Sequence, residues 1–145
     1  MSECAVLRTE RPMWQRWILA LATSVLVNEV LRLAAVAAFS VPPTFQPITR
    51  PAVIFWTAVG TTGGAMVFSL LRRYVSHPLE TFRKVALTVL VVSWIPDVLL
   101  LLSPPPQLPQ LPTAAVATLM VLHLPPWIAS TWFLTGGLLP RRGKR

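Results

Sequence analysis

The segment from residue 17 to residue 39, WILALATSVLVNEVLRLAAVAAF, limits the fold of this chain more than any other segment. An apolar run of about 20 residues is long enough to cross the hydrocarbon core of a bilayer as an α-helix. This run carries Asn28, Glu29 and Arg32 near its middle. An ionisable group at mid-bilayer costs about 2.5–3.5 kcal/mol on insertion scales. The segment therefore predicts a membrane helix whose polar groups meet partners on other membrane helices.

Three further apolar runs, expected at about residues 52–71, 85–102 and 113–139, provide helices for such contacts. The first run is not read as a cleaved secretory signal, because the apolar region of a signal is only about 7–15 residues long. The chain is 54% hydrophobic and 12% charged, whereas a soluble domain is about a quarter charged. We therefore predict an all-α, four-helix transmembrane bundle as one domain over residues 17–139, with polar tails at residues 1–16 and 140–145.

The net charge is +8, but the basic residues are not spread evenly along the chain. They gather in three segments that alternate with nearly uncharged segments. They lie in the N-terminal tail, between the second and third helices, and in the C-terminal tail: Arg8, Arg11 and Arg16; Arg72, Arg73, Arg83 and Lys84; Arg141, Arg142, Lys144 and Arg145. The other two connections hold Arg50 alone. Positively charged segments stay in the cytoplasm. This predicts a multi-pass protein of the inner (plasma) membrane with both termini cytoplasmic, an exposed thiol at Cys4, and no nucleic-acid partner.

The polar residues inside the predicted helices fall at similar depths. With a rise of 1.5 Å per residue, Glu29 and Asp97 lie about 18 Å from the cytoplasmic face, and Arg32 about 22 Å. His123 lies about 15 Å from the opposite face. These depths agree to within about one helical turn, so Arg32 can pair with Asp97, and Glu29 can hydrogen-bond to His123. The predicted polar cluster, which is the candidate ligand or proton site, is Asn28, Glu29, Arg32, Ser93, Asp97 and His123.

Glycine and proline positions predict packing and bends. Gly60 and Gly64 form a small-xxx-small face on the second helix, which lets another helix approach closely, in this chain or in a second copy. Pro96 lies inside the third helix and removes a backbone donor there. Pro125 and Pro126 are expected to kink or break the fourth helix.

Sequence signatures of a membrane enzyme are missing. The chain has no HExxH, no GxSxG, no P-loop and no paired Cys/His spacing for a metal. We therefore expect no enzymatic activity, no metal and no cofactor. A haem or chlorophyll bound through His123 would also need a flat apolar cavity beside it.

Three interpretations of the polar cluster remain. It locks the four helices together, it lines a polar cavity for a proton, a small ligand or a lipid or quinone headgroup, or it faces a partner subunit. The sequence thus favours a non-enzymatic accessory, scaffolding or small-ligand-binding membrane protein, whose partners are the bilayer and a membrane protein or a second copy. The alternative is a proton-coupled transporter or channel component.

Several short patterns also occur together in a known kind of protein. Asn28 and Arg32 stand four apart, FRKVA follows at residues 82–86, Ser93 and Pro96 form Ser-x-x-Pro, and Met120 precedes His123. This arrangement resembles a family of small four-helix bacterial membrane proteins of unknown function, found mainly in actinobacteria and Chloroflexi. In that family the Met and His are typically adjacent, whereas two residues separate them here. The resemblance implies the same architecture and no particular activity.

Overall fold

A computed structural model describes residues 12–39, 45–103 and 112–136, and every regular element in these ranges is helical. The elements are α1 (Met13–Phe39), a short 3-10 helix η1 (Gln46–Ile48), α2 (Arg50–Tyr74), α3 (Pro78–Leu102), α4 (Thr113–Leu122), α5 (Leu124–Ala129) and a π-helical turn η2 (Ser130–Leu134). Four helical segments are long and apolar enough to cross a membrane, with α4, α5 and η2 together forming the fourth. The prediction of an all-helical chain with four apolar helices is confirmed.

The first three helices begin earlier than the sequence predicted, and prolines stand in or before their first turns, whereas α4 begins at Thr113, as predicted. Pro12 precedes α1, Pro51 lies in the first turn of α2, and Pro78 opens α3. Proline suits this position because the first backbone N–H groups of a helix have no partner inside the helix. Both predicted polar tails lie mainly outside the described residues, as do Cys4 and the last residues of the predicted fourth helix.

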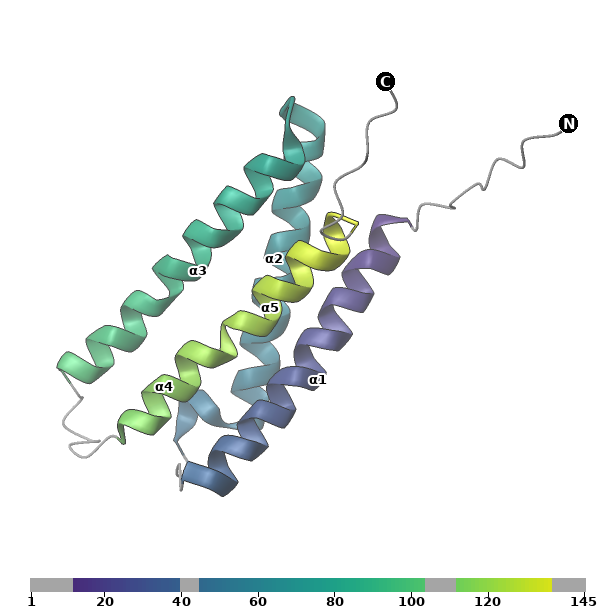
Figure 1. Cartoon of the computed structure of the whole chain (residues 1–145). Coiled ribbons are helices and arrows are strands. Elements are labelled where there is room, and N and C mark those ends of the chain that lie inside the picture. The colour runs from purple at the N-terminus through teal and green to yellow at the C-terminus, as the bar shows by residue number, and fades with distance from the viewer. Residues whose placement is uncertain (1–11, 40–44, 104–111, 137–145) are drawn as a thin grey trace, which may run out of the picture.

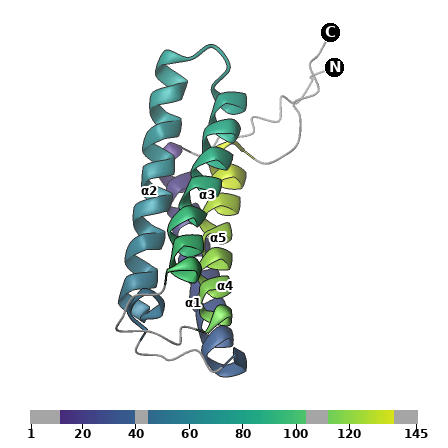
Figure 2. The same cartoon turned by 90° about the vertical axis from the view of Figure 1, so that its left-hand side faces the viewer.

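The helices run antiparallel as a bundle (Figures 1 and 2). α1 begins at the same end of the bundle at which α2 ends, α3 begins and η2 ends (Figure 1). α1 packs against α2 on one side and against α4, α5 and η2 on the other, whereas α3 packs mainly against α2 and α4. The helix α3 is therefore the peripheral one, and it buries only Phe82, Leu90 and Asp97.

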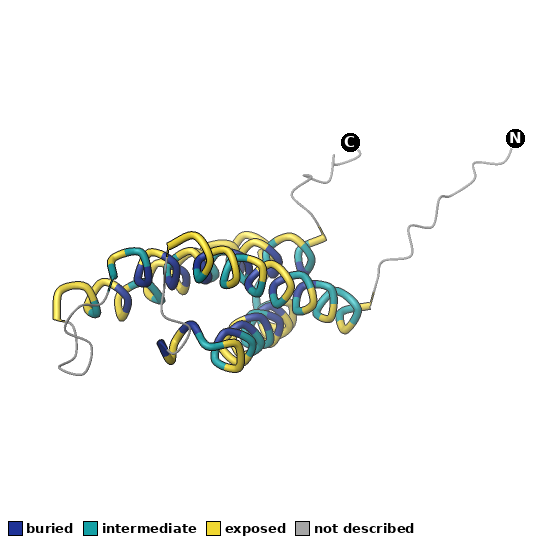
Figure 3. The backbone as a smooth tube through the Cα atoms, turned by 90° about the horizontal axis from the view of Figure 1, so that it is seen from below, coloured by how far each residue is buried: buried dark blue, intermediate teal, exposed yellow. Residues whose placement is uncertain are grey.

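The core consists of an apolar cluster toward each end with polar residues between them. One cluster joins Phe45 and Ile48 to the start of α4 through Ala115 and Leu119. The other joins Phe68 of α2 to Phe82 of α3 with ring centroids 4.9 Å apart, and includes Ala65 and Leu134. Buried positions face the inside of the bundle and exposed positions face outward (Figure 3).

The outer surface of the bundle is apolar along much of its length. Exposed large apolar side chains occur on all four helical segments, among them Leu26, Trp56, Val89, Leu102 and Ile128. In water such a surface would favour aggregation, whereas in a bilayer it contacts lipid chains of the same polarity. The surface and the four apolar helices together indicate a multi-pass membrane protein.

The two glycines of the predicted packing face on α2 have different surroundings. A Cβ atom built on Gly64 would lie 3.4 Å from the Ser130 hydroxyl, so this glycine lets η2 approach α2 within the chain. A Cβ atom on Gly60 would have no neighbour within 4 Å. Gly60 therefore does not share the close approach that Gly64 makes.

Candidate functional site

The fourth span is interrupted at His123, where α4 ends and α5 begins. Pro125 and Pro126 follow directly, and neither has a backbone N–H. In a continuous helix the N–H at position 126 would bond to the Leu122 carbonyl. Pro96 acts differently, because α3 continues through it from Pro78 to Leu102. The interruption therefore leaves backbone carbonyls without their usual hydrogen-bond donors inside an apolar bundle.

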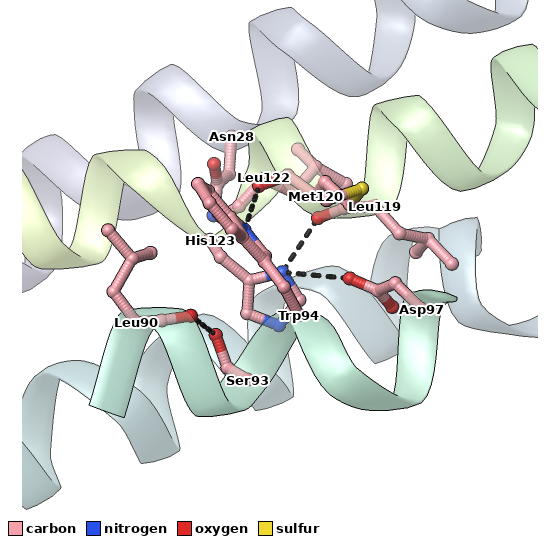
Figure 4. Close-up of polar contacts among 9 residues, drawn as sticks. All are labelled: Asn28, Leu90, Ser93, Trp94, Asp97, Leu119, Met120, Leu122 and His123. Carbon is pink, nitrogen blue, oxygen red and sulfur yellow. Dashed lines mark hydrogen bonds and ion pairs between the residues drawn. The ribbon is translucent and has the colours of Figure 1, made fainter. Parts of the chain in front are cut away.

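Asn28 of α1 supplies the donor that Pro126 lacks. Its Nδ2 donates to the Leu122 carbonyl at 3.0 Å and to the Thr57 hydroxyl of α2 at 2.7 Å. The side chain of Asn28 is only 1% exposed. Within the described ranges its Oδ1 has no hydrogen-bond partner. One buried amide thus ties α1, α2 and the broken span together. Figure 4 shows Asn28 beside Leu122 of the broken span.

Two further side chains donate to carbonyls at the same break. Trp94 of α3 donates from its Nε1 to the Met120 carbonyl at 3.1 Å. The backbone N–H of His123 bonds to the same carbonyl at 3.3 Å, instead of to the Leu119 carbonyl as in a regular α-helix. His123 Nδ1 lies 2.7 Å from the Leu119 carbonyl. Because a carbonyl only accepts, Nδ1 carries the hydrogen. We call Asn28, Trp94 and His123 the carbonyl clamp.

Asp97 faces the clamp from α3. Its Oδ2 lies 3.5 Å from His123 Nδ1, and the two side chains are 10% and 37% exposed. Within the described part of the chain this oxygen has no hydrogen bond of normal geometry. The predicted partner of Asp97 was Arg32, and this was wrong. The carboxylate faces a histidine on the neighbouring span instead (Figure 4).

Glu29 and Arg32 form a second polar group, separate from the clamp. Glu29 Oε2 accepts from Nε and Nη2 of Arg32, each at 3.2 Å, and lies 3.7 Å from Nε of Arg50. The predicted bond from Glu29 to His123 was therefore also wrong. Residues three apart on one helix are neighbours on its surface, so Glu29 and Arg32 meet without any second helix. We call Glu29, Arg32 and Arg50 the ion triad.

Ser93 does not join the other residues of the predicted polar cluster. Its hydroxyl donates to the Leu90 carbonyl of its own helix at 2.7 Å. Pro96 removes the donor to the Val92 carbonyl, and Ser93 does not replace that donor. The hydroxyl instead bonds within the preceding turn, as serine often does in helices.

Sequence reasoning missed three residues that take part in these groups: Thr57, Trp94 and Arg50. Thr57 and Thr61 stand four apart and both are buried, so a polar stripe on one face of α2 was a usable signal. Trp94 offered no such signal, since an indole in a membrane segment usually reads as an apolar or interfacial side chain. Arg50 stands in a connection by sequence and reaches Glu29 only through its long side chain.

This arrangement offers groups for hydrogen bonding, ion pairing and proton exchange. The described ranges contain no group of three or more His, Cys, Asp or Glu side chains that could hold a metal ion. Asp97 and His123 are two ionisable groups close enough to share a proton through a small rearrangement. The carbonyl clamp satisfies backbone groups that an apolar environment cannot satisfy.

Comparison with known proteins identifies a family. The model of a family described as a family of unknown function (DUF6069) matches residues 8–135. This range includes all four candidate membrane helices. No curated protein and no solved structure matches the chain.

Proposed function

The chain belongs to this family of unknown function, and we propose that it is a non-enzymatic accessory or scaffolding protein of the membrane. The observation that carries the proposal is the carbonyl clamp. Its three side chains donate to backbone groups of the broken fourth span, two of them from other helices. Polar groups engaged in this way hold helices in a fixed arrangement.

The ion triad supports the same role through the contact between Arg50 of α2 and Glu29 of α1. Glu29 and Arg32 are mostly buried and bind each other, and Arg50 adds a second cation from the start of α2. A pair joined in this way is electrically compensated and needs no external ligand. The two polar groups thus support the interpretation of the predicted cluster as a lock between helices, which leaves the apolar exterior for a partner protein.

The proposal predicts a stability defect without a transport defect when His123 is replaced by alanine. We expect the free energy of unfolding to fall by about 1–2 kcal/mol, because the Leu119 carbonyl loses its donor. Asp97→Asn should leave proton flux into proteoliposomes at the level of empty liposomes, as in the unaltered protein. Thermal unfolding in nanodiscs and a pH-sensitive dye inside the liposomes measure the two quantities. Ser93→Ala is the matched control, since its hydroxyl bonds only to its own helix.

A proton-coupled transporter or channel component is the second candidate, and the Asp97–His123 pair favours it. Ionisable residues inside membrane segments often mark proton paths, and the His123 side chain is partly exposed. A transporter predicts pH-dependent flux in the unaltered protein. It also predicts that Asp97→Asn abolishes this flux while unfolding stays nearly normal. That result would replace the scaffolding proposal.

We further propose that both termini and the connection between α2 and α3 face the cytoplasm, in the inner (plasma) membrane of a bacterium. The support is the distribution of charge at the two ends of the bundle. Within the described residues, Arg16, Arg72, Arg73, Arg83 and Lys84 lie toward the end where α1 begins and α2 ends, and Arg50 lies at the other. Basic segments next to membrane helices stay in the cytoplasm.

The single cysteine of the chain makes this topology directly testable. In intact cells, a membrane-impermeant maleimide should leave Cys4 unlabelled, and it should label Cys4 after the membrane is permeabilised. The matched control is the double variant Cys4→Ser/Ser103→Cys, which moves the thiol to the opposite end of the bundle. It should react in intact cells. Labelling of Cys4 in intact cells would reverse the proposed orientation.

A further inference from the structure

A groove of about 540 Å³ lies between α1 and α2, at the end of the bundle where α1 begins and α2 ends. Its walls are mainly apolar and include Trp14, Trp17, Met66 and Leu70. The groove is shallow and open along one side, unlike an enclosed ligand pocket. The groove opens on the outer surface of the bundle, away from the carbonyl clamp, and neither the clamp nor the ion triad contributes to it.

The groove extends along the helices over the depth of one lipid leaflet. On α2 its lining runs from Thr62 to Arg73 along one helix face, a rise of about 16 Å. This is half of a hydrocarbon core of about 30 Å. Trp17 Nε1 donates to the Thr62 hydroxyl at 3.2 Å and so joins α1 to α2 at the inner end. The shape therefore suits a chain that enters from the surface of the bilayer and stops near its middle.

Arg73 stands at the mouth of the groove. In the described part of the chain its guanidinium contacts the Tyr74 ring, with 5.9 Å from Cζ to the ring centroid, and forms no ion pair. Arg72 is exposed beside it. The nearest acidic residue in sequence, Glu80, is paired with Lys84 at 2.8 Å. The mouth thus carries positive charge at the level of the lipid headgroups.

We propose that this groove binds one anionic phospholipid, with the phosphate on Arg73 and an acyl chain along Met66, Leu70 and Trp14. Charge complementarity selects the headgroup, because basic pockets between membrane helices attract anionic lipids. The apolar walls and the length of the groove, which is about that of one lipid leaflet, favour a lipid over a free anion as the ligand. The site does not depend on the scaffolding proposal, so either can fail without the other.

Native mass spectrometry of the full chain, released from nanodiscs made of equal parts phosphatidylglycerol and phosphatidylcholine, tests the site. The unaltered protein should retain phosphatidylglycerol about fivefold over phosphatidylcholine. Arg73→Gln should bring the ratio close to one. Arg83→Gln is the matched control, since it removes a charge at the same end of the bundle but outside the groove. It should keep the preference.

A second variant tests the apolar part of the site. Ser69→Trp places a large side chain in the groove from an exposed position of α2, and it should reduce retention of both lipids while helicity stays unchanged. Equal loss of preference in Arg73→Gln and Arg83→Gln would reduce the effect to general surface charge and overturn the proposal. Displacement of the lipid by millimolar inorganic phosphate would make this a small-anion site. A dimer that Ser69→Trp dissociates would assign the groove to a second copy.

Discussion

Replacing Asn28 by leucine is expected to lower the free energy of unfolding by about 2–4 kcal/mol, because the substitution removes two hydrogen bonds and strands a buried carbonyl. Leucine has nearly the shape of asparagine, so the loss reports hydrogen bonding more than packing. The Leu122 carbonyl would have no donor, since position 126 is proline. Reversible unfolding in bicelles or by steric trapping measures the change. Thr57→Val removes only the second acceptor of Asn28 and should cost about 1 kcal/mol.

A second substitution tests whether Asn28→Leu lowers stability because the backbone donor at position 126 is missing. Pro126→Ala returns an N–H at the position that bonds to the Leu122 carbonyl in a continuous helix. In that background Asn28→Leu should cost markedly less, and the double-mutant cycle should give a coupling energy of about 1–2 kcal/mol. If Asn28→Leu has the same effect in both backgrounds, Asn28 does not act through the break in the fourth span.

Removing Glu29 should have the largest effect of any single change in the ion triad. Glu29→Leu leaves the mostly buried guanidinium of Arg32 without its counter-charge, which costs about 3–5 kcal/mol for a buried pair. Arg32→Leu should cost less, because Arg50 still lies 3.7 Å from the carboxylate. Arg50 itself is 73% exposed and can reach polar surroundings. The same unfolding assay measures both variants.

The double variant Glu29→Leu/Arg32→Leu should recover most of the stability lost in Glu29→Leu, because it strands neither charge. Arg32→Leu and Asp97→Leu, in contrast, should be additive, since the two side chains have different partners. Strong coupling between Arg32 and Asp97 would restore the pairing that the sequence alone predicted. It would also contradict the partners seen in the structure.

The number of helices and the approximate depth of the polar groups could be predicted from the sequence, but their partners could not. Depth follows from residue number along a helix, whereas partners depend on how each helix is rotated about its axis. In a soluble helix the apolar face reveals this rotation. In these helices nearly every face is apolar. The hydrophobic pattern of the sequence therefore does not show that Gly60 faces outward and Gly64 faces inward.

Two contacts could still have been predicted by local rules. Glu29 and Arg32 are three apart, and such pairs meet on a helix surface before any longer-range partner is considered. Pro125 and Pro126 identify backbone carbonyls that need outside donors, and Asn28 was the one uncharged amide at a similar depth. Trp94 was beyond such reasoning, because only the three-dimensional packing brings its Nε1 to the Met120 carbonyl.

The break in the fourth span also sets an order of assembly. A helix that crosses the bilayer by itself satisfies its own backbone, but this span depends on Asn28 of α1 for the donor to its Leu122 carbonyl, and Trp94 of α3 adds a second donor to its Met120 carbonyl. Those helices are synthesised first, so their donors are already in the membrane when the last span leaves the ribosome. The donors of the fourth span therefore come from helices made before it, and without Asn28 its Leu122 carbonyl would lie in the bilayer without a partner.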